Sequence, residues 1–259
     1  MKNTFLKSVL IVSFLVSGCT TTGSGLNTID VQHGEIKEPG RISLEYRLYQ
    51  TQSKSAPTVI IAHGCIGPKP KSLDVWAQQY REFGYNVLIV DSFSGRGYSN
   101  ICPNDTVRLV TPEMRANDIR RAAAFIKTQS WHRGKIAVVG YSHGGSTTLN
   151  LSNNPAAIKD IDAVISYYPS CHRGFVNRDY SQPIIPSMVH AAENDDWTPV
   201  SQCTNMEKHI FYVYPDATQG FITLTNFNDL GKYSIIRDNS ATELALSRDI
   251  KFLRDTIGN

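Results

Sequence analysis

Short apolar runs alternate with longer segments of helical periodicity along most of this chain. Continuous apolar runs are typical of strands buried in a parallel sheet. Apolar residues spaced three and four positions apart are typical of helices with one buried face. The apolar runs predict strands at 59–62, 87–90, 136–139, 163–168, 184–191 and 210–214, and an N-terminal strand is predicted at 42–49.

Helices are predicted between and after these strands. The first ends at Gly84, a residue that favours the backbone conformation found just after helices. The second opens at Thr111 and Pro112, an N-cap residue followed by proline at the first helical position. The apolar faces are Trp76, Tyr80 and Phe83 in the first helix, and Leu246, Ile250, Leu253 and Ile257 in the last.

Strands that alternate with helices predict an α/β fold, in which a mostly parallel sheet is covered on both faces. Ligands of such sheets bind beyond the carboxyl ends of the strands. Neither an internal repeat nor a second domain is evident, and the 259 residues suit one domain, which we assign to 31–259.

The N-terminal segment has the pattern of an export signal. Lys2 and Lys7 are followed by a short apolar stretch at 9–16, which is too short to span a membrane. The sequence Val-Ser-Gly-Cys ending at Cys19 resembles the lipobox of bacterial lipoproteins, and the alternative is an ordinary secretory signal. The resemblance implies a signal peptide at 1–18, a lipidated Cys19 and a polar tether over 19–30. It predicts a bacterial cell-envelope protein anchored to the membrane by lipid, with Thr20 favouring the outer membrane.

Charge and cysteine content narrow the picture further. The formal net charge is +3, and removal of Lys2 and Lys7 leaves +1, so nothing indicates a nucleic-acid partner. Four cysteines beyond Cys19 allow two disulfides in an exported chain, with three alternative pairings. We favour Cys65–Cys102 and Cys171–Cys203, because each pair falls on loops at the same end of the sheet. Free thiols are the alternative.

The segment that carries the clearest chemistry follows the strand at 136–139. It reads Gly140-Tyr141-Ser142-His143-Gly144, the G-x-S-x-G pattern of a nucleophile elbow, in which a tight strand-to-helix turn exposes a serine hydroxyl. A plain turn is the alternative. The N–H of His143 is then one candidate oxyanion donor. The N–H of Cys65, in the loop His-Gly-Cys-Ile-Gly at 63–67, is the other.

A serine nucleophile of this kind requires an acid and a base later in the chain. Asp195 follows the strand at 184–191 and is the candidate acid, with neighbouring Asp196 as the alternative. The base should follow the next strand, but all seven histidines lie at or before His209. None has a metal-ligand spacing, so we expect no metal and no cofactor.

Several segments together resemble the dienelactone hydrolase family over most of residues 40–257. They are HGCIG at 63–67, VDSFSGRG at 90–97, GYSHGG at 140–145, ENDDWTP at 193–199 and YPDATQGF at 214–221. The resemblance implies an α/β-hydrolase fold, Ser142 as nucleophile and Asp195 as acid. It places Gln219 where relatives have the triad histidine. Arg96 lies loosely where some relatives bind a substrate carboxylate, and a structural ion pair is its alternative role.

Gln219 limits the chemistry because an amide can donate and accept hydrogen bonds but cannot take a proton at neutral pH. The sequence therefore predicts weak activity or a base from elsewhere. His143, His172 and His190 are the candidates, with His172 favoured and also a candidate for substrate binding. The leading hypothesis is an exported serine hydrolase of small carboxylic esters or lactones. The alternative is a catalytically inactive binding lipoprotein that retains the pocket.

Overall fold

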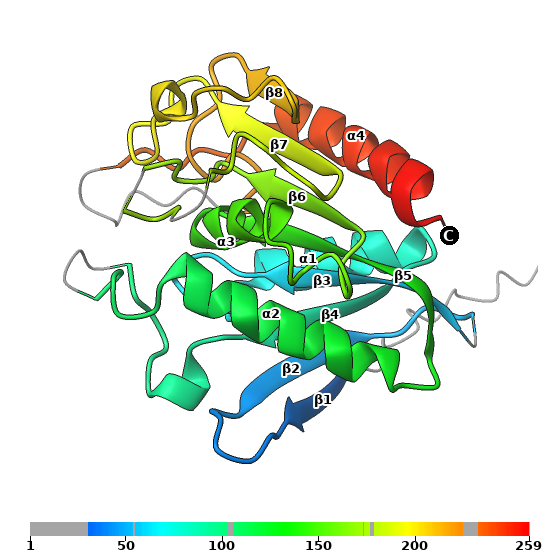
Figure 1. Ribbon diagram of the computed structural model, residues 1–259. Helices are drawn as coiled ribbons and strands as arrows, with labels where there is room; N and C mark the ends of the chain where they lie inside the picture. Colours follow the sequence, from blue (N-terminus) through cyan, green and yellow to red (C-terminus); the bar gives the residue numbers. More distant parts are fainter. Residues whose placement is uncertain are drawn as a thin grey trace, which may run out of the picture.

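A twisted eight-stranded sheet forms the centre of the molecule (Figure 1). The computed structural model describes residues 31–53, 55–102, 106–172, 174–176, 179–224 and 233–258. The predicted signal peptide, the tether and Cys19 lie outside the described residues. The strands are β1 (Val31–Ile36), β2 (Leu44–Tyr49), β3 (Ala56–Ala62), β4 (Asn86–Asp91), β5 (His132–Tyr141), β6 (Ala163–Tyr167), β7 (Ser187–Ala192) and β8 (Ile210–Tyr214).

The strand order is β1-β2-β4-β3-β5-β6-β7-β8. Strand β2 runs antiparallel to both β1 and β4, and all other neighbouring strands are parallel. The carboxyl ends of β3, β5, β6, β7 and β8 therefore meet at one edge, where the loops that follow them gather. This is the mostly parallel sheet that the sequence predicts.

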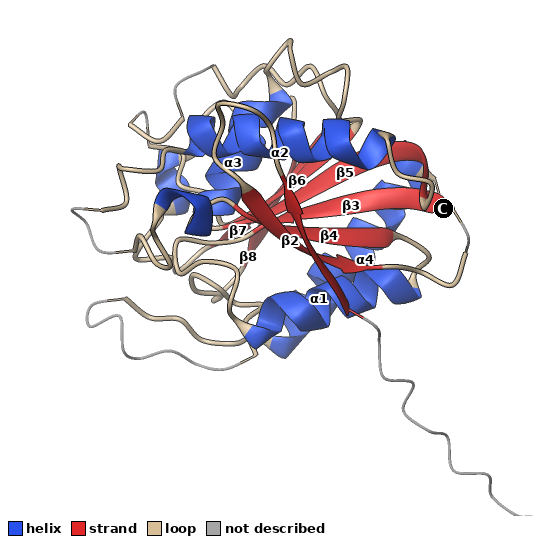
Figure 2. Ribbon diagram, turned by 90° about the horizontal axis from the view of Figure 1, so that it is seen from below, coloured by secondary structure: helices blue, strands red, loops and turns tan. Residues whose placement is uncertain are grey.

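Helices cover both faces of the sheet (Figures 1 and 2). Helices α2 (Pro112–Lys127) and α3 (His143–Ser152) lie on one face, and α1 (Lys71–Glu82) and α4 (Asn239–Ile257) lie on the other. Two short 3₁₀ helices, η1 (Ser94–Arg96) and η2 (Val200–Gln202), lie in loops. None of the helices in the described ranges is long and apolar enough to cross a membrane.

The core is divided by the sheet into two apolar layers. In β3, Val59 and Ile61 pack toward α1 and α4, whereas Ile60 and Ala62 pack toward α2. Successive side chains of a strand point to opposite faces, so a strand with helices on both sides is apolar at every position. This explains the continuous apolar runs in the sequence.

Most predicted boundaries agree with the structure. The Thr111 hydroxyl accepts a hydrogen bond from the N–H of Met114 at 3.2 Å, as expected of an N-cap. Strand β7 begins three residues later than predicted, because Pro186 has no N–H for the sheet ladder. Strand β1 was not predicted. Its sequence, VQHGEI, is mostly exposed and weakly patterned, and backbone pairing with β2 positions it.

Candidate active site

Ser142 lies at a sharp turn between β5 and α3. Its backbone angles are φ 54° and ψ −115°, a conformation that is strained for a residue with a side chain. The N–H of Ser142 donates to the carbonyl of Tyr167 at 3.0 Å, and the Ser142 carbonyl accepts from the N–H of Ser146 at 3.0 Å. The first of these bonds ties the turn to β6. The predicted elbow is therefore present.

The two glycines of the elbow allow β5, α3 and β3 to approach closely. A Cβ atom on Gly140 would lie 2.1 Å from the carbonyl oxygen of Gly144. A Cβ atom on Gly144 would lie 2.0 Å from the carbonyl oxygen of Ala62. Both distances are impossible for real atoms, so any larger residue would push the serine out of position.

Ser142 borders two adjoining pockets. The first, here called the apolar pocket, has a volume of about 280 Å³. The second, here called the polar pocket, has a volume of about 460 Å³ and carries Arg108 and His172 on its walls. Cys65 and Trp197 line both pockets. The apolar pocket is formed chiefly by Ile66, Leu73, Trp76, Tyr168, Ile222 and Ile235.

Gln219 lies beside Ser142, at the position where the resemblance places a histidine. Its Nε2 donates a hydrogen bond to Oγ of Ser142 at 2.8 Å, and its Oε1 accepts one from the Thr198 hydroxyl at 3.0 Å. Gln219 is almost fully buried. The serine is therefore contacted by an amide donor.

Asp195 is held next to this pair but does not reach Gln219 directly. Its Oδ1 accepts hydrogen bonds from the N–H groups of Trp197, at 2.9 Å, and Thr198, at 2.7 Å. Its Oδ2 contacts the Thr198 hydroxyl at 2.7 Å. Burial raises the pKa of Asp195. The neighbouring carboxylate of Asp196 instead accepts from the N–H of Ser234, at 3.3 Å, so Asp195 is the residue connected to Ser142.

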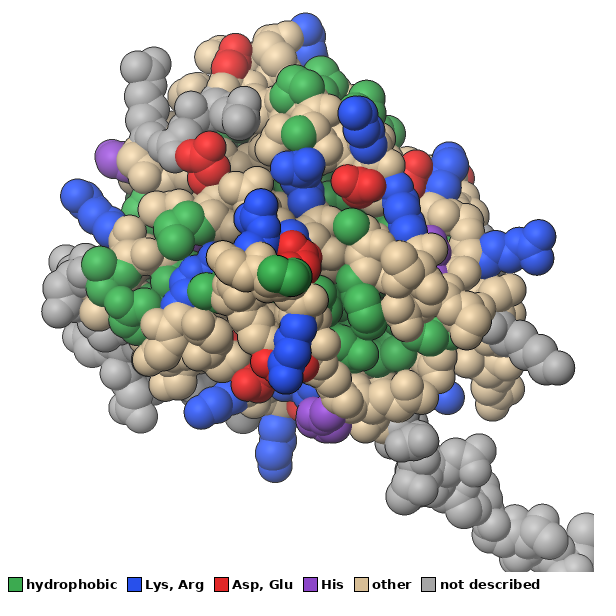
Figure 3. All heavy atoms as spheres, turned by 60° about the horizontal axis from the view of Figure 1, so that its bottom comes forward, with side chains coloured by type: hydrophobic (Ala, Val, Ile, Leu, Met, Phe, Trp, Pro, Cys, Tyr) green, Lys and Arg blue, Asp and Glu red, His purple; other side chains and the backbone are tan. Residues whose placement is uncertain are grey.

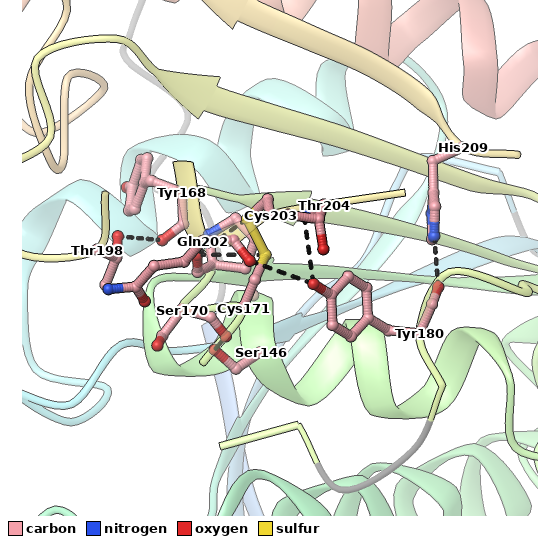
Figure 4. Close-up of a disulfide and its surroundings, with 12 residues drawn as sticks. Ser146, Tyr168, Ser170, Cys171, Tyr180, Thr198, Gln202, Cys203, Thr204 and His209 are labelled. Atoms are coloured by element: carbon pink, nitrogen blue, oxygen red, sulfur yellow. Dashed lines mark hydrogen bonds between the residues drawn. A yellow bond between two sulfur atoms is a disulfide. The ribbon is translucent and has the colours of Figure 1, made fainter. Parts of the chain in front are cut away.

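Thr198 completes a chain from Asp195 through Gln219 to Ser142, and sequence reasoning missed it. Its hydroxyl has one proton and three oxygen neighbours: Asp195, Gln219 and, at 3.2 Å, the Tyr168 carbonyl (Figure 4). The available signal was its spacing. An aspartate side chain commonly bonds the backbone of the turn that follows it, which brings Thr198 close to Asp195.

None of the described histidine rings hydrogen-bonds to Ser142. The ring of His143 is buried and its Nδ1 lies 2.8 Å from Nη1 of Arg115. Burial, followed by the charge of Arg115, holds the pKa of His143 well below its usual value. His190 is fully buried and contacts Tyr214 and Asp249. The exposed His172 lines the polar pocket, where its Nδ1 accepts from the N–H of Gly174 at 3.1 Å.

The loop that carries Cys65 lies against the elbow. A Cβ atom on Gly64 would be 3.7 Å from Cβ of Ser142. Nδ1 of His63 donates to the Gly64 carbonyl at 2.8 Å, so this histidine braces the loop. The Cys65 carbonyl accepts from the N–H of Ile101 at 2.8 Å.

Both favoured disulfides are present. Cys65 is joined to Cys102, and Cys171 is joined to Cys203. The second lies beside α3, close to Ser170 and Thr198 (Figure 4). The two crosslinks therefore fix loops on either side of Ser142.

Arg96 lines neither of the two pockets beside Ser142. Its guanidinium forms a two-pronged ion pair with Asp118, with distances of 2.7 and 3.0 Å, and also donates to the Ser92 carbonyl at 2.6 Å. These contacts are those expected of its alternative role, a structural ion pair. Within the described ranges no three histidine, cysteine or acidic side chains gather in a way that could hold a metal.

Comparisons with known proteins show the family and the fold of this chain. The sequence profile of the dienelactone hydrolase family matches residues 44–257. No curated protein matches the chain significantly. Est1E from Butyrivibrio proteoclasticus is 16% identical, with 86% of this chain and 98% of that chain covered and a TM-score of 0.61. The α/β hydrolase GrgF from Penicillium sp. sh18 is 15% identical, with coverages of 88% and 99% and a TM-score of 0.65.

The structural likenesses establish the α/β-hydrolase fold. The profile covers the elbow, the acid loop and the segment with Gln219. The chain belongs to the dienelactone hydrolase family.

Proposed function

We propose that this protein slowly hydrolyses small carboxylic esters through Ser142. The observation that carries the proposal is the strained elbow, which presents the Ser142 hydroxyl to a pocket next to the Cys65 loop. Oγ of Ser142 attacks the ester carbonyl, and the N–H groups of Cys65 and His143 stabilise the resulting oxyanion. The serine proton passes to solvent or to the departing alkoxide, and water then hydrolyses the acyl-serine.

The lining of the apolar pocket supports an uncharged, apolar acyl group as the preferred substrate portion. Among its described lining residues there is no charged side chain. A carboxylate placed there would lose its hydration without gaining a partner, which is strongly unfavourable. Esters of short aliphatic or aromatic acids suit this pocket better than lactones that carry a free carboxylate.

Slow turnover follows from Gln219. In another serine hydrolase, loss of the triad histidine costs about 10⁶ in turnover, while oxyanion stabilisation and binding retain about 10³–10⁴ over water. Gln219 occupies the position of the base without being able to accept the serine proton. Esters whose leaving group needs no protonation are therefore hydrolysed most readily.

A second candidate function is ligand binding without turnover. The hydrogen bond from Gln219 to Ser142 favours it, because this bond holds the hydroxyl without activating it. Such a protein is stabilised by ligands of the apolar pocket, and above the Kd the stabilisation grows with the logarithm of the ligand concentration.

The deciding experiment is hydrolysis of 4-nitrophenyl butyrate by the parent and by Ser142→Ala, with Ser53→Ala, an exposed serine, as the control. If the parent and Ser53→Ala hydrolyse the ester and Ser142→Ala does not, the result supports the hydrolase. Equal rates in all three proteins, together with thermal stabilisation by an uncleavable butyramide, identify the binding protein instead.

We further propose that the protein is a lipoprotein of the bacterial cell envelope, anchored to the membrane through Cys19, with a small ester as its partner and no nucleic acid. Acidic and basic side chains are interspersed on the face seen in Figure 3, in keeping with the small net charge. In cells fed labelled palmitate, we expect the parent to become labelled and Cys19→Ser to remain unlabelled. Equal labelling of both proteins contradicts the anchor.

A further inference from the structure

Arg115 is a fully buried arginine on α2, close to the active site but outside both pockets. Its exposed fraction is 0%. A buried guanidinium is costly unless its donors are matched, so its contacts indicate what it is placed to hold.

Two of these contacts reach the two segments that flank the nucleophile. Nη2 of Arg115 donates to the backbone carbonyl of His63 at 2.6 Å. Nη1 lies 2.8 Å from Nδ1 of His143. One side chain therefore joins the residue before the Gly64-Cys65 loop to the residue after Ser142.

The contact with His143 fixes the state of its imidazole. Arginine has no acceptor, so Nδ1 of His143 must accept, and the ring is neutral with its proton on Nε2. A neutral His143 ring agrees with its low pKa, which results first from burial and second from the charge of Arg115. Burial also lowers the pKa of Arg115, to about 9, which still leaves it charged at neutral pH.

The contact with His63 bears on the direction of the Cys65 N–H. In a planar trans peptide, the carbonyl of Gly64 and the N–H of Cys65 point in opposite directions. The His63 ring holds the Gly64 carbonyl at 2.8 Å, on the side away from the Cys65 N–H. Arg115 holds the backbone of that same histidine. The orientation of one donor therefore depends on His63, and His63 depends on Arg115.

We propose that Arg115 is a positioning residue that sets the two oxyanion donors, the N–H groups of Cys65 and His143, at their proper separation. This inference rests on the proposed function for its catalytic consequence. An oxyanion forms only during reaction, so misplaced donors lower kcat while leaving ground-state binding, and hence KM, nearly unchanged. A displacement of about 1 Å costs about 10²-fold in rate.

The test compares Arg115→Met with Arg121→Met in the full chain. Arg121 lies on the same helix, but its guanidinium contacts Glu38 and the Ile42 carbonyl near the antiparallel edge of the sheet. For 4-nitrophenyl butyrate we expect Arg115→Met to lower kcat about 10²-fold with KM within twofold, and Arg121→Met to keep both constants within twofold. Equal kcat values in a folded Arg115→Met and Arg121→Met overturn the proposal.

A second readout needs no turnover. Nitrogen NMR of the His143 ring should show the Nε2–H tautomer and no protonation down to pH 6 in the parent. Arg115→Met should change the tautomer or let the ring titrate. An unchanged ring in the folded variant contradicts the positioning role, even when the protein hydrolyses no ester. If Arg115→Met does not fold, Arg115→Lys takes its place, because lysine lacks the planar fork whose two terminal nitrogens contact His143 and His63 separately.

Discussion

Nε2 of Gln219 donates a hydrogen bond to Oγ of Ser142 across 2.8 Å, at the position where the family resemblance places a base. The direction of this hydrogen bond is opposite to that of an activating contact, in which the serine hydroxyl donates to a histidine nitrogen. The hydroxyl is held in place, and its proton has no acceptor on this side.

Replacement of Gln219 by histidine should restore a general base. We expect Gln219→His to raise kcat for 4-nitrophenyl butyrate by at least about 10²-fold, the low end of what general-base catalysis contributes. Steady-state kinetics measure the gain, with the exposed Gln52→His as the control. Unchanged turnover would mean that the missing base is not what limits the reaction.

The Thr198 hydroxyl should contribute to stability through its place between Asp195 and Gln219. Thr198→Val keeps the shape but leaves Oδ2 of Asp195 and Oε1 of Gln219 without this hydroxyl. Unsatisfied buried polar groups cost about 1–3 kcal/mol, so the free energy of unfolding should fall by that amount. Urea denaturation measures it. The exposed Thr204→Val should change it by less than about 0.5 kcal/mol, and an equally small change in Thr198→Val contradicts the prediction.

Stability should fall as the pH drops below about 6.5, the ordinary pKa of histidine. Burial holds the pKa values of His63 and His143 well below this in the folded protein. The unfolded chain therefore takes up protons first, and unfolding becomes more favourable toward acid. At pH 5.5, one unit below 6.5, each neutral buried ring should lower the free energy of unfolding by about 1 kcal/mol. Urea denaturation at pH 7.5 and 5.5 measures the loss, and His63→Gln should reduce its slope. A flat profile excludes neutral burial of these rings.

The two disulfides should contribute similarly to stability and differently to catalysis. They join residues 37 and 32 positions apart, and loops of this length correspond to about 4 kcal/mol each. Removing either pair by double alanine substitution should lower the unfolding midpoint to a comparable extent. Only loss of Cys65–Cys102 should also lower kcat, because Cys65 carries a proposed oxyanion donor. Equal kcat values in the two double variants speak against that role.

A buried polar cluster should anchor α4 to the sheet. One oxygen of Asp249 accepts from the hydroxyls of Tyr80, at 2.5 Å, and Tyr167, at 2.6 Å, and the other lies 2.8 Å from Nε2 of His190. Breaking a fully buried pair costs about 3–5 kcal/mol. Asp249→Asn should lose about that much stability in urea denaturation. Asp255→Asn, whose partner Lys251 is exposed on the same helix, should lose less than about 1 kcal/mol. Similar losses in both variants contradict the anchor.

The sequence by itself determined the features that depend on neighbouring residues. The sequence predicted seven of the strands. The continuous apolar runs mark β3 to β7, because a strand covered on both faces shows its burial at every position. The spacing of Gly140, Ser142 and Gly144 predicted the elbow, because the turn requires glycine at those positions. The segment at 214–221 placed Gln219 at the base position, because order along the chain is preserved in this fold.

Only the tertiary structure decided which distant groups meet. It placed Thr198 between Asp195 and Gln219, paired Arg96 with Asp118, and brought Arg115 between the two loops beside Ser142. Asp195 and Thr198 share one loop, but the other contacts join residues far apart in the sequence, and their approach depends on strand order and loop path. It also added β1, whose place is set by backbone hydrogen bonds to β2, a contact that leaves little trace in side-chain pattern.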